Sequence, residues 1–366
     1  MKDRFDSLDG LRGLAALVVV IGHFWPFQNF KSLPAINIFM DTKLPVAIFF
    51  VLSGVVLTHA ARNFKKDIKW LSFAILARYI RLLIPILAIS LLVAALYASG
   101  FILVDKLPAK YAEWEGYKIF YQFPATLGNA LQFSFFDVFF KYDPAKTFIP
   151  PSWTMRPELF ASTLLYIFLI GLSLGRLDRL PARFLPLFIP LAVVVFFTKD
   201  IIPGVFYFAY FLMGYVAYRL YLSFGTFLKG GIFAIAFVLS AKSLLFFWGV
   251  KGLFIDLIFA SLIVTLVISS WDIQAILANR VFLWLGKISF PLYLVHVPIF
   301  CSLGMFNFIL LDSVHIHAGI GWGLNFAITL SVCLGAAHLL TFVDLGTLKL
   351  LRGLKAKYRL HRVVPA

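Results

Sequence analysis

Residues 8–27 read LDGLRGLAALVVVIGHFWPF, an apolar stretch that nevertheless contains Arg12 and His23. A helix of about 20 apolar residues crosses the roughly 30 Å hydrocarbon core of a bilayer, so this stretch is long enough to span a membrane. Ionisable side chains within a span are costly and often functional. Arg12 and His23 are 11 residues apart. This is close to three helical turns, so both side chains are predicted on one face, about 16 Å apart along the axis. Alternatively, Arg12 reaches the inner headgroups and His23 bonds a neighbouring helix.

The rest of the chain is similarly apolar. Of its 366 residues 61% are hydrophobic and 14% are charged, and the mean hydropathy is +0.92. A soluble domain of this size has no core large enough for so many apolar side chains. We therefore predict an all-α polytopic membrane protein with about ten transmembrane helices. The predicted spans are residues 8–28, 44–61, 82–99, 153–174, 184–198, 204–222, 228–248, 253–270, 282–310 and 320–342.

Basic residues predict the orientation of these spans, because Lys and Arg are retained on the cytoplasmic side. The stretches ARNFKKDIKW (61–70) and LLRGLKAKYRLHRVV (350–364) then lie in the cytoplasm, as do both termini. This bias accounts for the net charge of +16 without a nucleic-acid partner. We predict a membrane domain over residues 1–348 and a basic cytoplasmic tail over residues 349–366 that lies against the anionic lipid of the bilayer.

The segment 100–152 faces outward in this topology and is rich in aromatic residues. Its first part is too polar to span the membrane. We predict short interfacial or re-entrant helices that cover the outer face, where a lid over a substrate site is expected.

Two arginines precede the third predicted span in ARYIRLLIP (77–85). Arg78 and Arg81 are three residues apart, so they share one helical face at the predicted cytoplasmic entrance of the membrane. Paired guanidinium groups suit a phosphate or pyrophosphate, although anchoring at the headgroups explains the same spacing. In the second span, FFVLSGVVL places Ser53 before a glycine, which is typical of close helix packing and also allows a hydroxyl contact.

The sequence PPSWTMRPELF (150–160) predicts a helix start, since proline is tolerated in a first turn. Glu158 then lies near the outer end of the fourth predicted span, at a depth compatible with His23. It either complements the helix N-terminus, pairs with Arg156, or orients His23 and raises its basicity. Trp153 in the same motif is a further candidate for the site.

The ninth predicted span contains LGKISFPLYLVHVPIF, which places His296 about one turn after Tyr293. A lone histidine in a membrane more often makes a packing hydrogen bond than it catalyses a reaction. Asp256 has no evident partner in the sequence. The pair His315 and His317 has no third ligand nearby, so we predict no metal site.

Five motifs, in this order, resemble those of the acyltransferase-3 family of integral membrane acyltransferases. They are LDGLRGLAALVVVIGH with its Arg-x10-His spacing, FFVLSG, RYIRLLIP with Arg-x-x-Arg, PSWTMRPELF and ISFPLYLVH. The resemblance covers about residues 8–342. In the fourth motif the family commonly has two adjacent acidic residues after Trp-Ser/Thr-Leu, whereas this chain has Glu158 alone, preceded by Pro157.

The resemblance implies transfer of an acyl group, often acetyl, from cytoplasmic acyl-CoA to a hydroxyl of a carbohydrate or lipid-linked glycan at the outer face. Arg12, Arg78 and Arg81 are expected to bind the anionic donor. His23 is expected to be the general base, with Glu158 orienting its ring or stabilising its protonated form. An acyl-histidine intermediate is an open variant of this mechanism.

Four further residues are expected to support the site: Ser53, Trp153, Tyr293 and His296. No metal or bound cofactor is expected, because acyl-CoA acts as a substrate. The expected location is a bacterial inner membrane, and the sequence indicates no oligomeric state. The alternative function is a multi-span transporter or flippase of glycans or lipids without acyl transfer, although no inverted repeat is evident.

Overall fold

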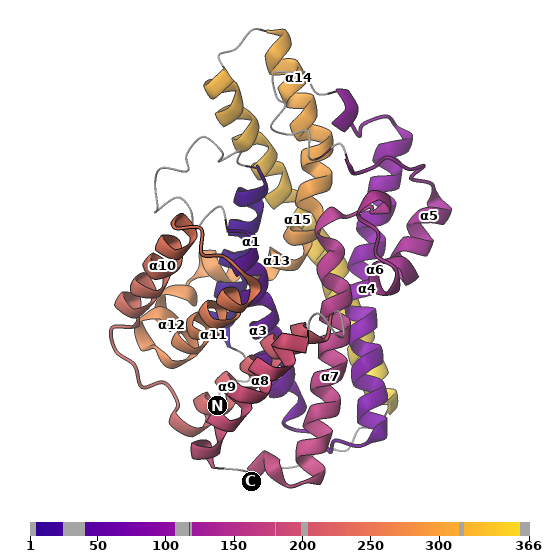
Figure 1. The fold of residues 1–366 in the computed structure, drawn as a ribbon. Helices are drawn as coiled ribbons and strands as arrows, with labels where there is room; N and C mark the ends of the chain where they lie inside the picture. The colour runs from indigo at the N-terminus through magenta and orange to yellow at the C-terminus, as the bar shows by residue number, and fades with distance from the viewer. Residues whose placement is uncertain are drawn as a thin grey trace.

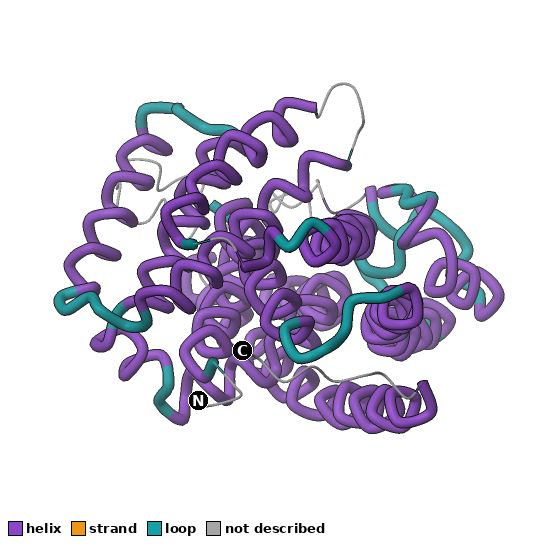
Figure 2. Tube along the Cα trace, turned by 90° about the horizontal axis from the view of Figure 1, so that it is seen from below, coloured by secondary structure: helices purple, strands orange, loops and turns teal. Residues whose placement is uncertain are grey.

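The computed structural model describes residues 5–24, 41–106, 117, 119–179, 181–198, 204–314 and 318–358. Within these residues the chain is helical and has no β-strand, which confirms the predicted all-α class. The long helices run along the length of the molecule (Figure 1), and several of them are seen nearly end-on from below (Figure 2). His315 and His317 lie outside the described residues, as do residues 359–366 of the predicted tail.

Seven helical runs in the described part of the chain are long and apolar enough to cross a membrane. They are α1 (Asp6–Phe24), α3 (Lys43–Ala61), α4 (Ile68–Ala98), α7 (Met155–Leu174) with the turn before it, α9 (Phe208–Phe224) with the turn before it, α13 (Arg280–Ile299) continued by α14 (Met305–Ser313), and α15 (Ala318–Tyr358). Three shorter apolar helices coincide with the remaining predicted spans: α8 (Phe188–Phe197) with the turn before it, α10 (Gly231–Phe247) and α11 (Leu253–Ser269). The number of ten membrane crossings stays a prediction.

Helix α4 begins earlier than the predicted span 82–99. Its N-terminus is capped by Asp67, whose side chain accepts a hydrogen bond from the backbone N–H of Trp70 at 2.9 Å. The apolar pattern of the sequence does not reveal the start of α4 at Ile68, because charged residues precede the apolar stretch from residue 82 onward. These residues do not interrupt the helix. Arg78 and Arg81 therefore lie inside a 31-residue helix instead of in a stretch that precedes it.

Helix α15 likewise continues past the predicted span 320–342 and through the boundary drawn at residue 348. Near its end, the Lys355 ammonium lies 4.2 Å from the ring centroid of Phe64, and the ring of Tyr358 packs on Phe73. The end of α15 and the start of α4 thus share one end of the molecule. The placement of this end in the cytoplasm stays a prediction.

The described part of segment 100–152 forms short helices, as expected from its sequence. They include α5 (Leu127–Gln132), a five-residue π-helix (Phe133–Asp137) and α6 (Val138–Phe140). These elements pack beside α4 and α7 (Figure 1). Residues 107–116 and 118 lie outside the described residues, and the predicted role as a lid is untested.

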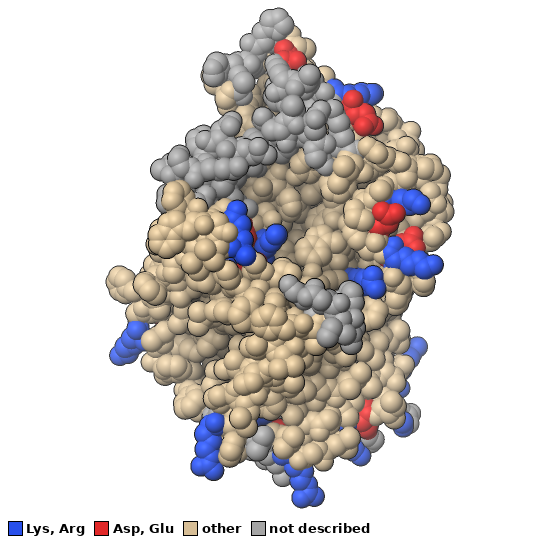
Figure 3. Space-filling view, in the orientation of Figure 1, with Lys and Arg blue, Asp and Glu red and all other residues tan. Residues whose placement is uncertain are grey.

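The outer surface has the character of a lipid-facing protein. On the face shown in Figure 3, a broad uncharged area separates charged side chains at the lower end from those in the upper half. On α10, Phe233 is 81% exposed and Phe237 is 74% exposed. Large aromatic side chains with this exposure are costly in water but not in a bilayer.

Helices α1 and α13 approach each other closely through glycines. A Cβ atom on Gly13 would collide with the backbone of Leu285 and Gly286, and one on Gly286 would collide with the backbone of Asp9. Small residues allow this approach in a membrane, where dispersion and hydrogen bonds drive helix association. The face of α1 that carries Arg12 is thereby turned toward α13.

A buried charge cluster joins α3, α10 and α11. The Lys242 ammonium lies 2.6 Å from Oδ1 of Asp256 and 3.0 Å from Oδ2 of Asp41. Asp41 also accepts hydrogen bonds from the backbone N–H groups of Lys43 and Leu44 in the first turn of α3. The sequence gives no evident partner for Asp256, whereas the structure pairs it directly with Lys242.

The glycine contact makes a prediction about stability. We expect Gly13→Ala to lower the free energy of unfolding by about 1–3 kcal/mol, because the added methyl group forces α1 and α13 apart. Gly335→Ala in α15 is the matched control, since nothing lies within 4 Å of the position where its Cβ would be. Thermal unfolding of both variants in the same detergent measures the difference. Equal melting temperatures would contradict the predicted contact.

Candidate active site

A cavity of about 360 Å³ lies among α1, α3, α4, α7, α13 and α15. Its lining brings together side chains from motifs that are far apart in the sequence. Six of the predicted site residues line it: Arg12, Ser53, Arg78, Arg81, Glu158 and Tyr293.

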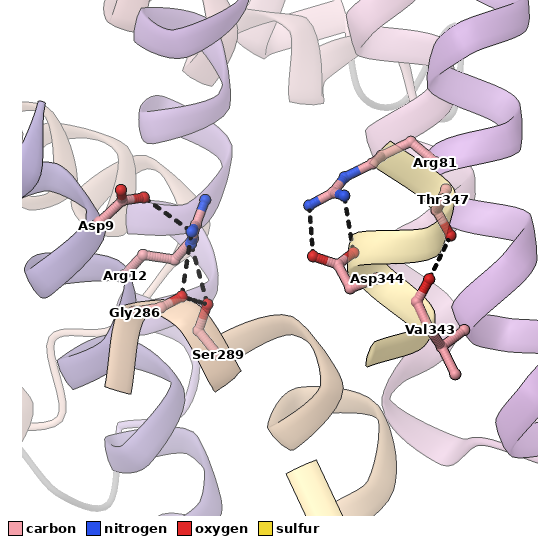
Figure 4. Close-up of polar contacts among 8 residues, drawn as sticks. All are labelled: Asp9, Arg12, Arg81, Gly286, Ser289, Val343, Asp344 and Thr347. Atoms are coloured by element: carbon pink, nitrogen blue, oxygen red, sulfur yellow. Dashed lines mark hydrogen bonds and ion pairs between the residues drawn. The ribbon is translucent and has the colours of Figure 1, made fainter. Parts of the chain in front are cut away.

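Arg12 is held against α13 on one side of the cavity. Its Nε donates a hydrogen bond to Oγ of Ser289 at 3.0 Å, and Nη2 donates to Oδ1 of Asp9 at 2.9 Å and to the carbonyl oxygen of Gly286 at 3.1 Å. Within the described part of the chain, Nη1 has no such partner. Figure 4 shows this guanidinium group facing the open space that separates it from Arg81. One N–H edge of Arg12 is therefore available to a ligand.

Arg81 lies on the opposite side of the cavity and pairs with Asp344 of α15 (Figure 4). Nη2 of Arg81 donates a hydrogen bond to Oδ2 at 3.0 Å, and Nη1 lies 2.8 Å from Oδ1 as an ionic contact. Sequence reasoning missed Asp344, although an acidic residue late in an apolar run is a signal in itself. The pair ties α4 to α15 across the lining of the cavity.

Glu158 forms an ion pair with Arg78, and its Oε1 also accepts a hydrogen bond from Oγ of Ser53 at 2.7 Å. Nε of Arg78 donates to Oγ of Ser162 at 3.1 Å. This network joins α3, α4 and α7. The structure thus pairs Glu158 with Arg78 and not with the predicted partners, Arg156 and His23. Because α4 begins at Ile68, Arg78 lies inside the helix and reaches the carboxylate of Glu158.

His23 instead contacts His296, with Nδ1 of His23 3.1 Å from Nε2 of His296. The two ring centroids are 5.1 Å apart, and His296 is fully buried. Arg12 and His23 both contact α13, which confirms that they share one face of α1. Neither histidine lines the cavity of about 360 Å³.

Tyr293 lies between the cavity and the histidine pair. Its side chain lines the cavity, and its ring centroid is 6.1 Å from that of His296. Its hydroxyl donates a hydrogen bond to the carbonyl oxygen of Pro151 at 2.8 Å and lies 3.2 Å from Oγ1 of Thr154. Trp153 is not part of this arrangement: it is 40% exposed and its ring packs near Tyr207.

The lining of the cavity carries more positive than negative charge. It includes four cationic side chains, those of Arg12, Arg78, Arg81 and Lys287, against the two carboxylates of Glu158 and Asp344. Guanidinium groups favour anionic, multiply charged ligands such as phosphates. Lys287 and Ser289 are lining residues that sequence reasoning did not single out.

Long apolar helices around an arginine-rich internal cavity define the class of the protein as an integral membrane protein with a polar interior site. A family model described as "Acyltransferase domain" matches residues 5–341, so the chain belongs to the acyltransferase-3 family. O-acetyltransferase PaAT-1 of Phomopsis amygdali is 32% identical over an alignment of 97 positions, which covers 21% of this chain and 20% of that protein. The aligned segment thus spans about a fifth of this relative. No solved structure matches the chain.

The observed pairing of Glu158 can be tested by a double-mutant cycle. We expect Glu158→Leu to lower the free energy of unfolding by about 3–5 kcal/mol, because it leaves the guanidinium of Arg78 buried without a counter-charge. Adding Arg78→Met should recover much of this loss. In the matched control, Glu158→Leu and His23→Ala should have additive effects on unfolding in detergent. Coupling of Glu158 to His23 but not to Arg78 would contradict the observed network.

Proposed function

We propose that the protein is an O-acyltransferase that moves an acyl group, specifically acetyl, from acyl-CoA to a hydroxyl group. The observation that carries the proposal is the cavity, where Arg12 of α1 faces Arg78 and Arg81 of α4 across one space. The name of the partial relative, O-acetyltransferase, supports an oxygen acceptor and an acetyl group.

The charged end of the donor matches the cavity. CoA carries a pyrophosphate and a further phosphate, and arginine binds such groups through two parallel hydrogen bonds. The open Nη1 edge of Arg12 and the excess of cations in the lining support binding of this end. The pantetheine arm would then extend along α1 from Arg12 toward His23, a distance of about 16 Å along the helix.

His23 is the residue that we propose as the general base. A hydroxyl is a weak nucleophile near neutral pH, so a neutral imidazole must accept its proton as the oxygen attacks the thioester carbonyl carbon. The carbon–sulfur bond then breaks, and the leaving thiolate takes a proton from the imidazolium of His23. This sequence of steps needs no metal and no prosthetic group.

The acceptor that we propose is a hydroxyl of a carbohydrate or lipid-linked glycan at the outer face of a bacterial inner membrane. The excess of basic residues supports donor entry from the cytoplasm, because the end where α4 begins and α15 ends would lie on that side.

The first test of this function concerns His23. We expect purified His23→Ala to bind acetyl-CoA as tightly as the wild type but to lose acetyl transfer by at least about 100-fold, the contribution of a general base. His338→Ala is the matched control, because His338 is exposed on α15 and contacts Trp284. Release of free CoA thiol, with membrane glycans as acceptor, measures turnover. A wild type that binds no acyl-CoA would refute the proposed function.

The second test concerns the counter-charge of Arg81. We expect Asp344→Asn to tighten acetyl-CoA binding about 10-fold, equivalent to 1.4 kcal/mol, because a ligand phosphate no longer competes with a carboxylate for the guanidinium. Arg81→Ala should weaken binding instead. S-acetylpantetheine, which has no phosphate, is the control ligand and should bind both variants like the wild type. Unchanged acetyl-CoA binding by Asp344→Asn in calorimetry would contradict this view of the cavity.

A further inference from the structure

Two imidazole rings and one carbonyl group form a continuous chain of contacts between α13 and α1. Nδ1 of His296 lies 3.1 Å from the carbonyl oxygen of Leu292, one turn earlier in the same helix. Nε2 of His296 lies 3.1 Å from Nδ1 of His23. Both nitrogens of His296 are therefore engaged, whereas within the described residues His23 is linked to another helix through Nδ1 alone.

The chemistry of these groups fixes where the hydrogens lie. A carbonyl oxygen can only accept a hydrogen bond, so Nδ1 of His296 must carry a hydrogen. A neutral imidazole has one N–H, which leaves Nε2 of His296 as an acceptor. Nδ1 of His23 must then be the donor, and Nε2 of His23 is left with a free lone pair.

A charged His296 would reverse this assignment, but its surroundings oppose the charge. The ring is fully buried, and within the described part of the chain no carboxylate contacts either His23 or His296. Burial of an unpaired positive charge is strongly unfavourable, so the neutral ring is favoured.

We propose that His296 is a positioning residue that holds His23 in the tautomer with an unprotonated Nε2. The inference rests on the proposed function in that it takes His23 as the base. A carboxylate commonly orients a catalytic histidine in this way. Here the neutral imidazole of His296 orients the ring of His23, and it brings no further charge into the membrane interior.

Further contacts hold the two rings in register. The hydroxyl of Tyr117 donates a hydrogen bond to the backbone carbonyl of His23 at 2.9 Å, which fixes the end of α1. The ring of Phe24 packs edge-on against that of Phe300, with ring centroids 4.8 Å apart, in the π-helix Phe300–Gly304 that follows α13. His23, the hydrogen-bond donor to His296, is thus held through its backbone as well as through its ring.

The protons balance along this chain during transfer. The hydroxyl proton moves to Nε2 of His23 as the new carbon–oxygen bond forms, and the thiolate takes that proton when the carbon–sulfur bond breaks. The hydrogen on Nδ1 of His23 stays on that atom throughout and remains hydrogen-bonded to Nε2 of His296. His296 therefore exchanges no proton with the substrates.

Two amide variants of His296 separate positioning from packing. In His296→Gln the side-chain oxygen can take the place of Nε2 and accept from His23. In His296→Asn the amide can replace only Nδ1, and the acceptor is lost. We expect kcat to fall about 10- to 100-fold in His296→Asn and to be largely retained in His296→Gln. The KM for acetyl-CoA should be unchanged in both, since His296 does not line the cavity. Equal losses or equal retention of kcat would overturn the proposal.

Nitrogen NMR of ¹⁵N-histidine-labelled protein in nanodiscs tests the tautomer without any turnover. The signals of His23 are identified by their absence in His23→Ala. The wild type should show a protonated Nδ1 and an unprotonated Nε2, and His296→Asn should lose this preference. A proton on Nε2 of wild-type His23 would overturn the inference even if the enzyme transfers acetyl groups. If the protein neither binds nor uses acyl-CoA but shows the expected tautomer, the proposed function is refuted and the tautomer assignment still stands.

Discussion

The close contact of α1 with α13 positions both ends of the candidate site. Glycines remove the side chains that would hold the two backbones apart, so Arg12 reaches the carbonyl of Gly286 and His23 reaches the ring of His296. Apolar surfaces alone would not fix this alignment, since lipid covers them as well as a neighbouring helix does. The polar contacts fix the register of the two helices. A slide of one helix along the other would separate His23 from His296 and Arg12 from Gly286 and Ser289, which is costly for ionisable side chains within a membrane.

Carboxylates balance the charge of two arginines in the cavity. Arg78 pairs with Glu158 and Arg81 pairs with Asp344, so neither guanidinium is buried as an isolated charge. An anionic ligand must therefore exchange partners with these carboxylates, at a net gain smaller than the attraction to a bare arginine. The arrangement offsets the cost of placing these charges inside a membrane, and it favours ligands with several negative charges, which can engage more than one arginine at once.

The sequence predicted those features that depend on local spacing. The shared face of Arg12 and His23 follows from helical geometry and is confirmed, and five ordered motifs indicated the family that the family model confirms. The partner of Glu158 could not be found in this way, because it depends on a cap at Asp67 that starts α4 before its apolar run. The contact between His23 and His296 joins residues 273 positions apart, and no local pattern specifies that register.

The structure also bears on the alternative interpretations of the motifs. An arginine that anchors a helix at the headgroups extends toward water, whereas the side chain of Arg78 is 15% exposed and faces a carboxylate that is 10% exposed. Transporters commonly bind cargo where helices are broken near the middle of the membrane. Here α1, α3, α4, α13 and α15 run past the cavity without a break, and α7 begins at its edge. A site walled mainly by continuous helices suits a reaction between two bound substrates better than passage of one cargo across the bilayer.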